Sequence, residues 1–332
     1  MTNTLFPSRR TLGALGLAGL MALGLGVGAQ AQAQTWPERP VTIIVPFPAG
    51  GNTDTMARLL AERLQRKLGQ GFVIDNRPAG GGIVATGQVA RAKPDGYTLL
   101  FASAGQNIIL PMLVKVTYDP VKDLAPISIF GAGAFILGAK KETPFNTMPE
   151  LIAYAKANPG KLNVASAGNG SIGHLSAALF AKRASLDMVT VPYKGGGPAI
   201  AALVAGETDL YFGNASELLQ FVSTDRIKLL GVSTLEPLPQ VPNVPMVSSI
   251  FPGFTTSSWN GLIGPVGIPA EIINKLVKET AEAAADPVLA EKLNAIGIKP
   301  VGSTPEAFAQ IIEKERPLYR EAVDAAGLKM EE

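Results

Sequence analysis

The sequence predicts an α/β fold built as two lobes. Short apolar runs rich in β-branched residues alternate with longer stretches in which apolar residues recur at helical spacing. This alternation is typical of strands that run largely parallel and are joined by helices. About 300 residues follow an N-terminal apolar segment, and a chain of that length favours two compact parts over one.

Strands and helices are expected at regular intervals. The expected strands are 41–46, 72–75, 97–102, 126–130, 134–139, 162–165, 188–191, 208–212, 227–232 and 259–264, and the expected helices are 52–68, 83–92, 105–113, 147–158, 172–184, 196–205, 215–223, 270–284, 287–296 and 305–325. Helix ends are clearest near the C-terminus, where Asp286 caps a helix that starts at Pro287 and Gly297 follows its last apolar residue. Pro317 predicts a kink in the last helix.

Two segments are expected to carry the chain between the lobes. One is the β-rich segment 124–145, and the other is the proline-rich segment 231–259. With these crossings, lobe 1 comprises 34–130 plus 240–332, and lobe 2 comprises 131–239.

Residues 1–33 are expected to be a cleaved export signal. Arg9 and Arg10 precede the apolar segment 12–28, and small residues in an A-x-A pattern follow at 29–33. Six glycines in the apolar segment argue against a membrane span. The paired arginines resemble a twin-arginine signal, and export by the general secretion route stays open. The mature product is therefore expected in the periplasm and not embedded in a membrane.

The composition excludes several classes of function. Removal of the leader takes two of the 29 basic residues, so that the remaining ones equal the 27 acidic residues. A neutral chain gives no electrostatic case for nucleic acid or an anionic membrane as partner. The chain has no cysteine and a single histidine, His174. We therefore expect no metal, no cofactor and no lipid anchor, and a fold stabilised by its hydrophobic core.

The first candidate binding element is the stretch PFPAGGNTD at 46–54, between an apolar strand and a helix. Helix starts carry unpaired backbone N–H groups, and glycine allows close approach of a ligand. The stretch is therefore either a place that holds a small anion or an ordinary turn without a ligand. In the first case Ala49, Gly50 and Gly51 are expected to donate these groups, and Phe47 to form a wall of the cleft. Asp54 is favoured as a first-turn charge over a ligand contact, because it would repel an anion.

A second strand, glycine turn and helix occupies 163–175, NVASAGNGSIGHL. Ser166, Gly168, Asn169 and Ser171 form the counterpart of the first turn. Ser171 either caps the helix or donates its hydroxyl to a ligand, and the two roles are compatible. Two such turns from different lobes are what a cleft between lobes requires.

Other turns contribute further candidates. The stretch 192–199, PYKGGGPA, contains Tyr193 and Gly197 and offers a third backbone-exposed helix start. Ser103 and Gln106 follow an expected strand, where they either face the cleft or cap the next helix.

His174 invites a hydrolase hypothesis with Ser171, but the spacing is not the strand-to-helix elbow of serine hydrolases. A helix start disfavours the imidazolium form, so His174 is interpreted as neutral and is favoured as a structural or supporting residue over a direct ligand contact, for which it is also a candidate.

Several segments together resemble the Bug receptors, the extracytoplasmic solute-binding proteins of tripartite tricarboxylate transporters. The matching segments run in the expected order along nearly the whole mature chain: PFPAGGNTD (46–54), IDNRPAGGG (74–82), AKPDGYTLL (92–100), SAGNGSIGHL (166–175), VPYKGGGPA (191–199), AGETDLYF (205–212) and SWNGLIGP (258–265). One departure is Gly213, where many relatives carry an acid, beside the candidate cleft residue Asn214.

The resemblance implies a two-lobed type II periplasmic-binding-protein fold with a central cleft, no catalysis, and a carboxylate ligand held by backbone amides and water. It implies a monomer and a membrane permease as partner; a sensor kinase is the alternative partner, and a hydrolase using His174 the alternative activity. Arg77 is expected to pair with Asp75 or Asp95 rather than to receive an anion, and Trp259 to pack the hinge rather than line the cleft. A cleft with few charges favours a ligand with one carboxylate and an uncharged body.

Overall fold

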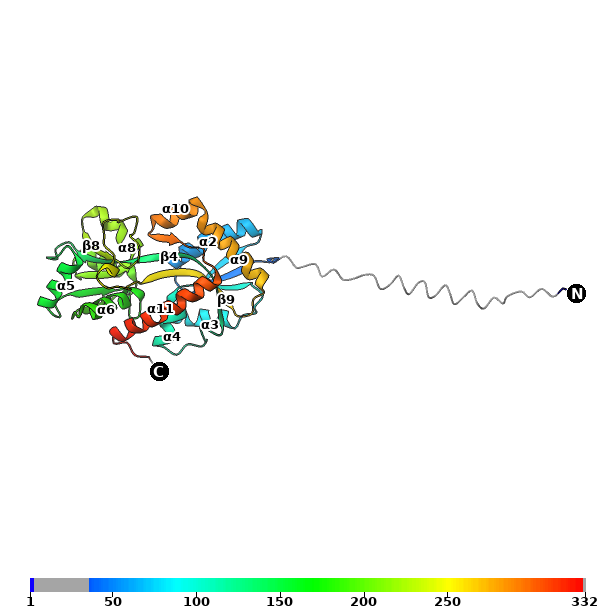
Figure 1. The fold of residues 1–332 in the computed structure, drawn as a ribbon, viewed down its shortest axis with the longest axis horizontal. Coiled ribbons are helices and arrows are strands. Elements are labelled where there is room, and N and C mark those ends of the chain that lie inside the picture. The colour runs from blue at the N-terminus through cyan, green and yellow to red at the C-terminus, as the bar shows by residue number, and fades with distance from the viewer. Residues whose placement is uncertain (3–35, 331–332) are drawn as a thin grey trace. The chain divides into compact units, whose positions relative to one another are not determined.

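The computed structural model describes residues 1–2 and 36–330 (Figure 1). The export signal expected at 1–33 therefore lies outside the described residues, apart from its first two. Residues Arg39–Glu332 form a unit of their own, and the fold is built within it. No helix in the described part is long and apolar enough to cross a membrane.

Three parallel strands form one end of the sheet. β1 (Val41–Val45) lies between β2 (Phe72–Asn76) and β3 (Thr98–Ala102) and pairs with both. The connections between these strands are helical: α2 (Asn52–Leu68), the short η1 (Ala79–Gly82) and α3 (Ile83–Ala90). β1 and β3 are almost fully buried, because helices cover the sheet and hydrophobic residues fill both of its faces.

Three more parallel strands form the other end. β5 (Asn163–Ser166) lies between β6 (Val189–Pro192) and β7 (Leu210–Asn214). α6 (Ile172–Ala184) connects β5 to β6, and α7 (Gly196–Ala205) connects β6 to β7. Each lobe thus repeats the same strand, turn and helix unit around its own parallel strands.

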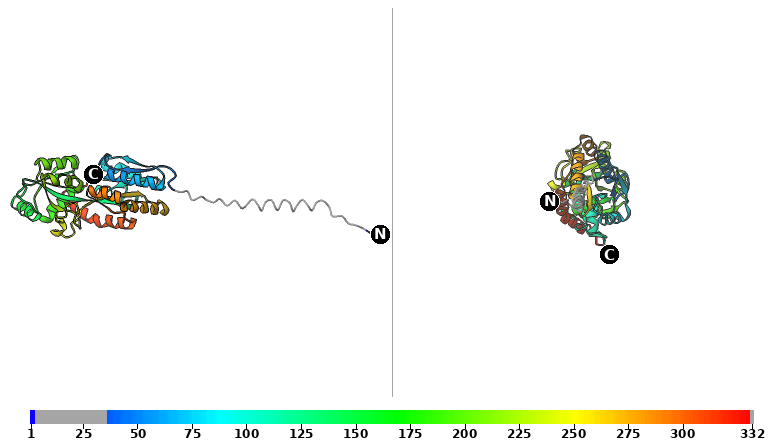
Figure 2. Two further views of the ribbon diagram at one scale, coloured as in Figure 1. Left: turned by 90° about the horizontal axis from the view of Figure 1, so that it is seen from above. Right: turned by 90° about the vertical axis from the view of Figure 1, so that its right-hand side faces the viewer.

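Two long antiparallel strands join the ends. β4 (Leu124–Lys140) pairs with β9 (Ser257–Pro265) over its first part and with β7 and β8 (Ile227–Val232) over its last part. The strand order is β2-β1-β3-β9-β4-β7-β5-β6, with β8 and β10 (Ile298–Pro300) paired to β4. Figures 1 and 2 show β4 and β9 passing from the blue and orange elements of one lobe to the green elements of the other.

This arrangement confirms the α/β fold but corrects two expectations. The strands are parallel only within each lobe, since β4 and β9 are antiparallel to their neighbours. The strands expected at 126–130 and 134–139 are one strand, β4. Gly131 interrupts the apolar pattern because β10 lies against it: a Cβ there would come within 2.8 Å of Ile298 Cγ2. The lobe limits set at 130 and 240 stay a prediction.

The remaining helices follow the expected positions closely, except that a short helix at Val247–Ser249, η4, lies where none is expected. They are η2 (Gly105–Ile109), α4 (Leu110–Leu113), α5 (Met148–Ala157), α8 (Ala215–Leu218), η3 (Leu219–Thr224), η4 (Val247–Ser249), α9 (Ala270–Ala285), α10 (Pro287–Ala295) and α11 (Pro305–Ala325). Asp286 caps α10 by accepting from the N–H groups of Val288 and Leu289. α11 continues as a helix past Pro317.

A buried polar contact fixes α11 to β9. Glu315 of α11 accepts a hydrogen bond from Trp259 Nε1 at 2.7 Å, and the indole ring packs edge-on against Phe308 of the same helix. Trp259 is buried and does not line the ligand pocket described below, so the packing role expected for it is confirmed. Burial raises the pKa of Glu315 to about 7, and hydrogen bonds from Trp259 and Ser257 only partly oppose this rise.

We expect Glu315→Gln to stabilise the protein above pH 7 but not near pH 4.5. The unfolded chain ionises Glu315 from its ordinary pKa of 4.5, whereas the folded protein keeps the proton up to about 7. The free energy of unfolding of the wild type therefore falls as pH rises through this window, by on the order of 2–3 kcal/mol, and the glutamine variant escapes this loss. Urea denaturation of both proteins at pH 4.5 and pH 8 measures the difference. An equal difference at both pH values would contradict the burial of this carboxyl.

We expect Gly173→Ala to destabilise the fold by about 1–3 kcal/mol. A Cβ at Gly173 would lie 2.2 Å from the carbonyl oxygen of Phe212, which belongs to the backbone of β7 and cannot turn away. The matched control is Gly197→Ala, also in the first turn of a helix, where a Cβ meets nothing within 4 Å. Thermal denaturation should show a lower midpoint for the first variant and an unchanged or higher one for the second. Equal midpoints would refute the close approach of α6 to β7.

Candidate functional site

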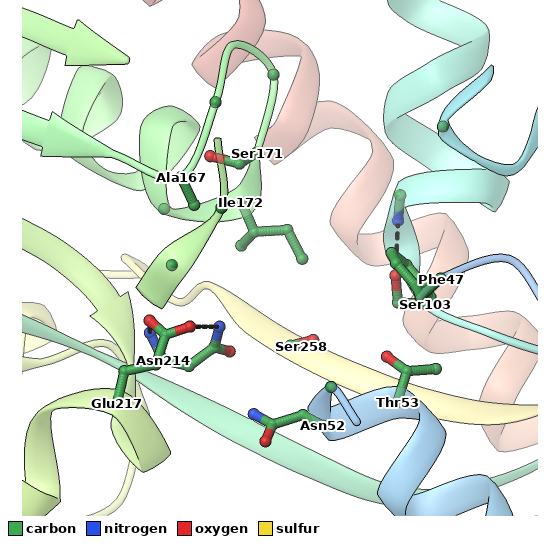
Figure 3. A pocket seen from close by; sticks show the side chains of 18 of the residues that line it. Phe47, Asn52, Thr53, Ser103, Ala167, Ser171, Ile172, Asn214, Glu217 and Ser258 are labelled. Atoms are coloured by element: carbon green, nitrogen blue, oxygen red, sulfur yellow. Dashed lines mark hydrogen bonds between the residues drawn. The ribbon is translucent and has the colours of Figure 1, made fainter. Parts of the chain in front are cut away.

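A pocket of about 680 Å³ opens between the two lobes, at the carboxyl ends of the parallel strands. Its walls are the turns that follow β1, β2, β3, β5, β6 and β7, together with Phe135 of β4 and Ser258 of β9. Figure 3 shows Phe47 and Ser103 at one end of the pocket and Asn214 and Glu217 at the other. Ligands of α/β proteins bind at this edge of the sheet because the helix starts and the loops converge there.

The start of α2 forms the first wall. Its N-cap residue, Gly51, is extended, with φ −78° and ψ 171°, and no side chain caps the helix. Among the hydrogen bonds of residues 36–330, none is donated by the backbone N–H groups of Gly51, Asn52 or Thr53. These donors carry the partial positive charge of a 17-residue helix and border the pocket.

Asp54 fixes this turn from behind. Its Oδ2 accepts from the Gly50 N–H at 2.8 Å and from Arg58 Nε at 3.0 Å, and its Oδ1 accepts from Asn76 Nδ2 at 2.9 Å. Burial raises the pKa of Asp54, but these three hydrogen bonds outweigh it and hold the pKa below its usual value. Asp54 therefore supports the turn and does not line the pocket. The Gly50 N–H, expected to bind a ligand, is already bonded to this carboxylate.

The start of α6 forms the second wall. Ser171 is its N-cap, and Ser171 Oγ accepts from the His174 backbone N–H at 3.2 Å, which confirms the predicted cap. His174 Nδ1 accepts from the Gly170 N–H at 3.1 Å, so the proton of the neutral ring is on Nε2. Burial lowers the pKa of His174, in agreement with a neutral side chain.

The third wall comes from the start of α7 and from α8. Glu217 and Asn214 form a capping box at the start of α8, in which Glu217 Oε2 accepts from the Asn214 N–H at 3.2 Å. Glu217 Oε2 also accepts from Tyr211 Oη at 2.7 Å. A Cβ at Gly196, the first residue of α7, would lie 1.9 Å from Glu217 Oε1, so the carboxylate sits directly against that helix start.

The departure at Gly213 has a local cause. A Cβ at this position would lie 2.1 Å from Cε1 of Tyr211, whose ring covers the glycine. A side chain at 213 and the present position of Tyr211 are therefore incompatible.

The structure brings most of the candidate residues together. The predicted residues that line the pocket are Phe47, Gly50, Gly51, Ser103, Gln106, Gly168, Asn169, Ser171, Gly197 and Asn214. Ser103 and Gln106 are almost fully buried and bond mainly to their own loop, with Gln106 Nε2 donating to the Gly81 carbonyl at 3.0 Å. That these residues bind a ligand stays a prediction.

Four further candidates lie outside the pocket, in addition to Asp54. Ala49 is exposed at the outer side of its turn. Ser166 is buried and shapes the next turn, because its Oγ donates to the Gly168 carbonyl and accepts from the Gly168 N–H. Tyr193 packs against the lobe 2 core, and His174 of α6 lines a different cavity.

Sequence reasoning missed several lining residues, chiefly Asn52, Thr53, Tyr211, Glu217 and Ser258. Thr53 Oγ1 donates to Asn260 Oδ1 of β9 at 2.7 Å. Asn52 Nδ2 donates to Ser216 Oγ at 2.9 Å and so links α2 of one lobe to α8 of the other. The spacing of Asn214 and Glu217 carried the signal of a capping box, but a cap does not indicate which way its carboxylate faces.

Charge is scarce in this site. Glu217 is the one charged side chain among the lining residues that the structure describes. Arg77 pairs instead with Asp75 at 2.7 Å, the first of the two partners expected for it, and Arg39 pairs with Asp95. The pocket therefore holds no arginine that could bind a carboxylate, and its positive end consists of backbone amides.

The chain matches a known family along most of its length. The profile described as "Tripartite tricarboxylate transporter family receptor" matches residues 56–328. A protein encoded in the tcbD-tcbE intergenic region of Pseudomonas sp. (strain P51) is 34% identical over 310 residues, which cover 92% of each chain. The protein BugT of Bordetella pertussis is 33% identical over 300 residues, 90% of this chain and 92% of BugT.

Solved structures share the fold. Rpa4515 of R. palustris, determined with adipate, has a TM-score of 0.79 and 33% identity, and the match covers 89% of this chain and 100% of that one. MatC of Rhodopseudomonas palustris, with bound malate, has a TM-score of 0.74 and 32% identity, and covers 87% of this chain and 100% of its own. These neighbours confirm the two-lobed periplasmic-binding fold expected from the sequence. The profile and the relatives agree along nearly the whole described chain, and the protein belongs to the tripartite tricarboxylate transporter receptor family of TctC- and Bug-type solute-binding receptors.

Proposed function

We propose that this protein is a periplasmic receptor that captures a small carboxylate between its lobes and delivers it to the permease of a tripartite tricarboxylate transporter. The observation that carries the proposal is the uncapped start of α2, whose free N–H groups border a pocket of about 680 Å³. Two structural neighbours, Rpa4515 and MatC, carry adipate and malate, both small carboxylates. Family membership supports a membrane permease as the partner.

The carboxylate is expected to bind at the N–H groups of Asn52 and Thr53. Each charge-assisted hydrogen bond of this kind contributes about 1.5–3 kcal/mol, so two or three of them account for useful affinity without an arginine. Ser171 caps α6 with a lone pair and keeps its hydroxyl hydrogen free for the ligand.

Closure of the lobes is expected to enclose the ligand. β4 and β9 are the antiparallel strands that join the lobes, and they are suited to a hinge motion. The hydrogen bond from Asn52 to Ser216 joins the lobes across the pocket and favours the closed arrangement.

The geometry gives no support to the alternative of a hydrolase. The side chains of Ser171 and His174 are not hydrogen-bonded to each other. Ser171 Oγ accepts from the backbone N–H of His174, and His174 Nδ1 accepts from the backbone N–H of Gly170. A nucleophile requires a base within hydrogen-bond reach, so we propose a binding protein without catalysis.

A thermal-shift screen of residues 34–332 tests the proposal. Linear and hydroxylated carboxylates of three to eight carbons, adipate and malate among them, should include members that raise the melting temperature. A ligand at a hundredfold excess over its dissociation constant adds about 2.7 kcal/mol to the stability. Mass spectrometry of the denatured protein reveals ligand retained from expression. No shift and no retained carboxylate would refute the proposal.

We expect Asn52→Pro to weaken carboxylate binding about tenfold or more relative to Asn52→Ala. Both variants lose the amide side chain that contacts Ser216, but only proline removes the backbone N–H at the first helical position. Proline suits this position, and the extended Gly51 before it tolerates a following proline. Titration calorimetry with the best carboxylate from the screen provides the comparison.

Equal melting temperatures of the two ligand-free variants serve as the control for folding. Equal affinities would show that the start of α2 does not hold the carboxylate.

A further inference from the structure

The pocket carries a carboxylate of its own that anion binding does not explain. Glu217 lies at the end formed by α7 and α8, away from Phe47 and Ser103 (Figure 3). A receptor for anions gains nothing from a negative charge in its binding site, since like charges repel. The position of Glu217 therefore requires another reason.

The contacts of Glu217 show that it acts only as an acceptor. Three donors converge on it: Tyr211 Oη and the Asn214 N–H on Oε2, and Asn214 Nδ2 on Oε1 at 3.4 Å. An ionised carboxylate has about four acceptor positions, so Oε1 keeps at least one unfilled and has only a long bond. Oε1 is also the oxygen that lies closest to Gly196, and both Gly196 and Glu217 line the pocket.

No cation neutralises this carboxylate. Glu217 takes part in none of the ion pairs found among residues 36–330. Lys194, the basic residue nearest to Gly196 in the sequence, is exposed and does not line the pocket. Among the described residues, the negative charge of Glu217 is stabilised only by neutral hydrogen-bond donors and by the partial positive charge at the start of α7, which has no side-chain cap.

A capping role alone does not account for a glutamate here. The capping box needs one acceptor for the Asn214 N–H, and glutamine supplies it equally well. The cap uses Oε2, whereas Oε1 lies against Gly196, a residue that lines the pocket.

The site is therefore polarised. At α2 it offers free N–H groups, and at α7 the helix start is already occupied by Glu217. A ligand carboxylate is favoured at the first end and disfavoured at the second, where a hydrogen-bond donor fits.

We propose that the ligand is a monocarboxylate with a hydrogen-bond donor, an ammonium or a hydroxyl group, at its far end, and that Glu217 selects it against dicarboxylates. This inference rests on the proposed receptor function and adds the ligand class. Tyr211 positions the glutamate through the 2.7 Å hydrogen bond. The adipate and malate bound to the two structural neighbours each carry a second carboxylate, which Glu217 would oppose here.

The test is a matched series of linear carboxylic acids of three to eight carbons whose far end is methyl, hydroxyl, ammonium or carboxylate. Affinities are measured by calorimetry at each length, for the wild type and for Glu217→Gln. The wild type should bind an ammonium or hydroxyl acid about tenfold or more tightly than the dicarboxylate of equal length. In the Gln variant this ratio should fall about tenfold or more, with the dicarboxylate gaining affinity, because the amide donates where the carboxylate repelled.

Tyr211→Phe is the matched second variant. It removes one of the donors to Oε2 but keeps the charge of the carboxylate, which the two contacts from Asn214 still hold, so the same ratio should not fall. A purely structural role of α8 would shift all four ligand types together in both variants.

The outcomes separate the two proposals. If dicarboxylates bind the wild type most tightly and Glu217→Gln leaves the ratio unchanged, the ligand class is wrong and the receptor function stands. If no carboxylate binds either protein, both proposals fail. Preference for ammonium over hydroxyl, or the reverse, identifies which donor the site takes.

Discussion

The antiparallel pairing of β4 with β9 is the interaction on which the rest of the molecule depends. It joins the parallel strands of the two lobes and places their turns at one common edge. Successive side chains of β9 point to opposite faces of the sheet. Ser258 therefore borders the pocket, while Trp259 lies on the other face and donates to Glu315. Asn260, on the face of Ser258, accepts from Thr53 and so fixes the start of α2. One strand thus carries both the packing against α11 and the alignment of α2, the helix proposed to bind the ligand.

Three helix starts, and only one charged side chain among the described residues, line the pocket. The three starts differ in how they are capped. α2 has none, α6 is capped by Ser171 and supported by His174, and α7 meets the carboxylate of Glu217. The fold provides similar turns in both lobes, and the local side chains decide which turn attracts an anion. Similar glycine-rich turns therefore do not offer a ligand the same hydrogen-bond donors. The Gly50 N–H, for example, is already bonded to Asp54.

Local sequence patterns predicted the features that depend on residues close together in the sequence. They did not predict the features that depend on contacts with distant segments. The strand, glycine turn and helix units, the caps by Ser171 and Asp286 and the pair of Arg77 with Asp75 all follow from residues within a few positions. The single strand β4 was missed because Gly131 reads as a break until β10, far along the chain, is seen to pack on it. The sequence pattern indicates a core residue at Tyr211. Its contact with Glu217 depends on how the chain turns after β7. The resemblance to a family indicated the cleft but not its polarity.

Under the two proposals, the short helix α8 would connect ligand selection to lobe closure. Ser216, which receives the hydrogen bond from Asn52 of the opposite lobe, directly precedes Glu217. The capping box that orders Asn214 and Glu217 therefore also orders the acceptor of the contact between lobes. A ligand that donates to Glu217 and accepts from the start of α2 bridges the same two elements that Asn52 and Ser216 join, and reinforces their contact. Under the same proposal, a dicarboxylate would repel Glu217, push α8 away from α2 and oppose closure. Selectivity in such a site acts on the closed state as well as on binding, since a ligand shifts an equilibrium only by its difference in affinity for the two states.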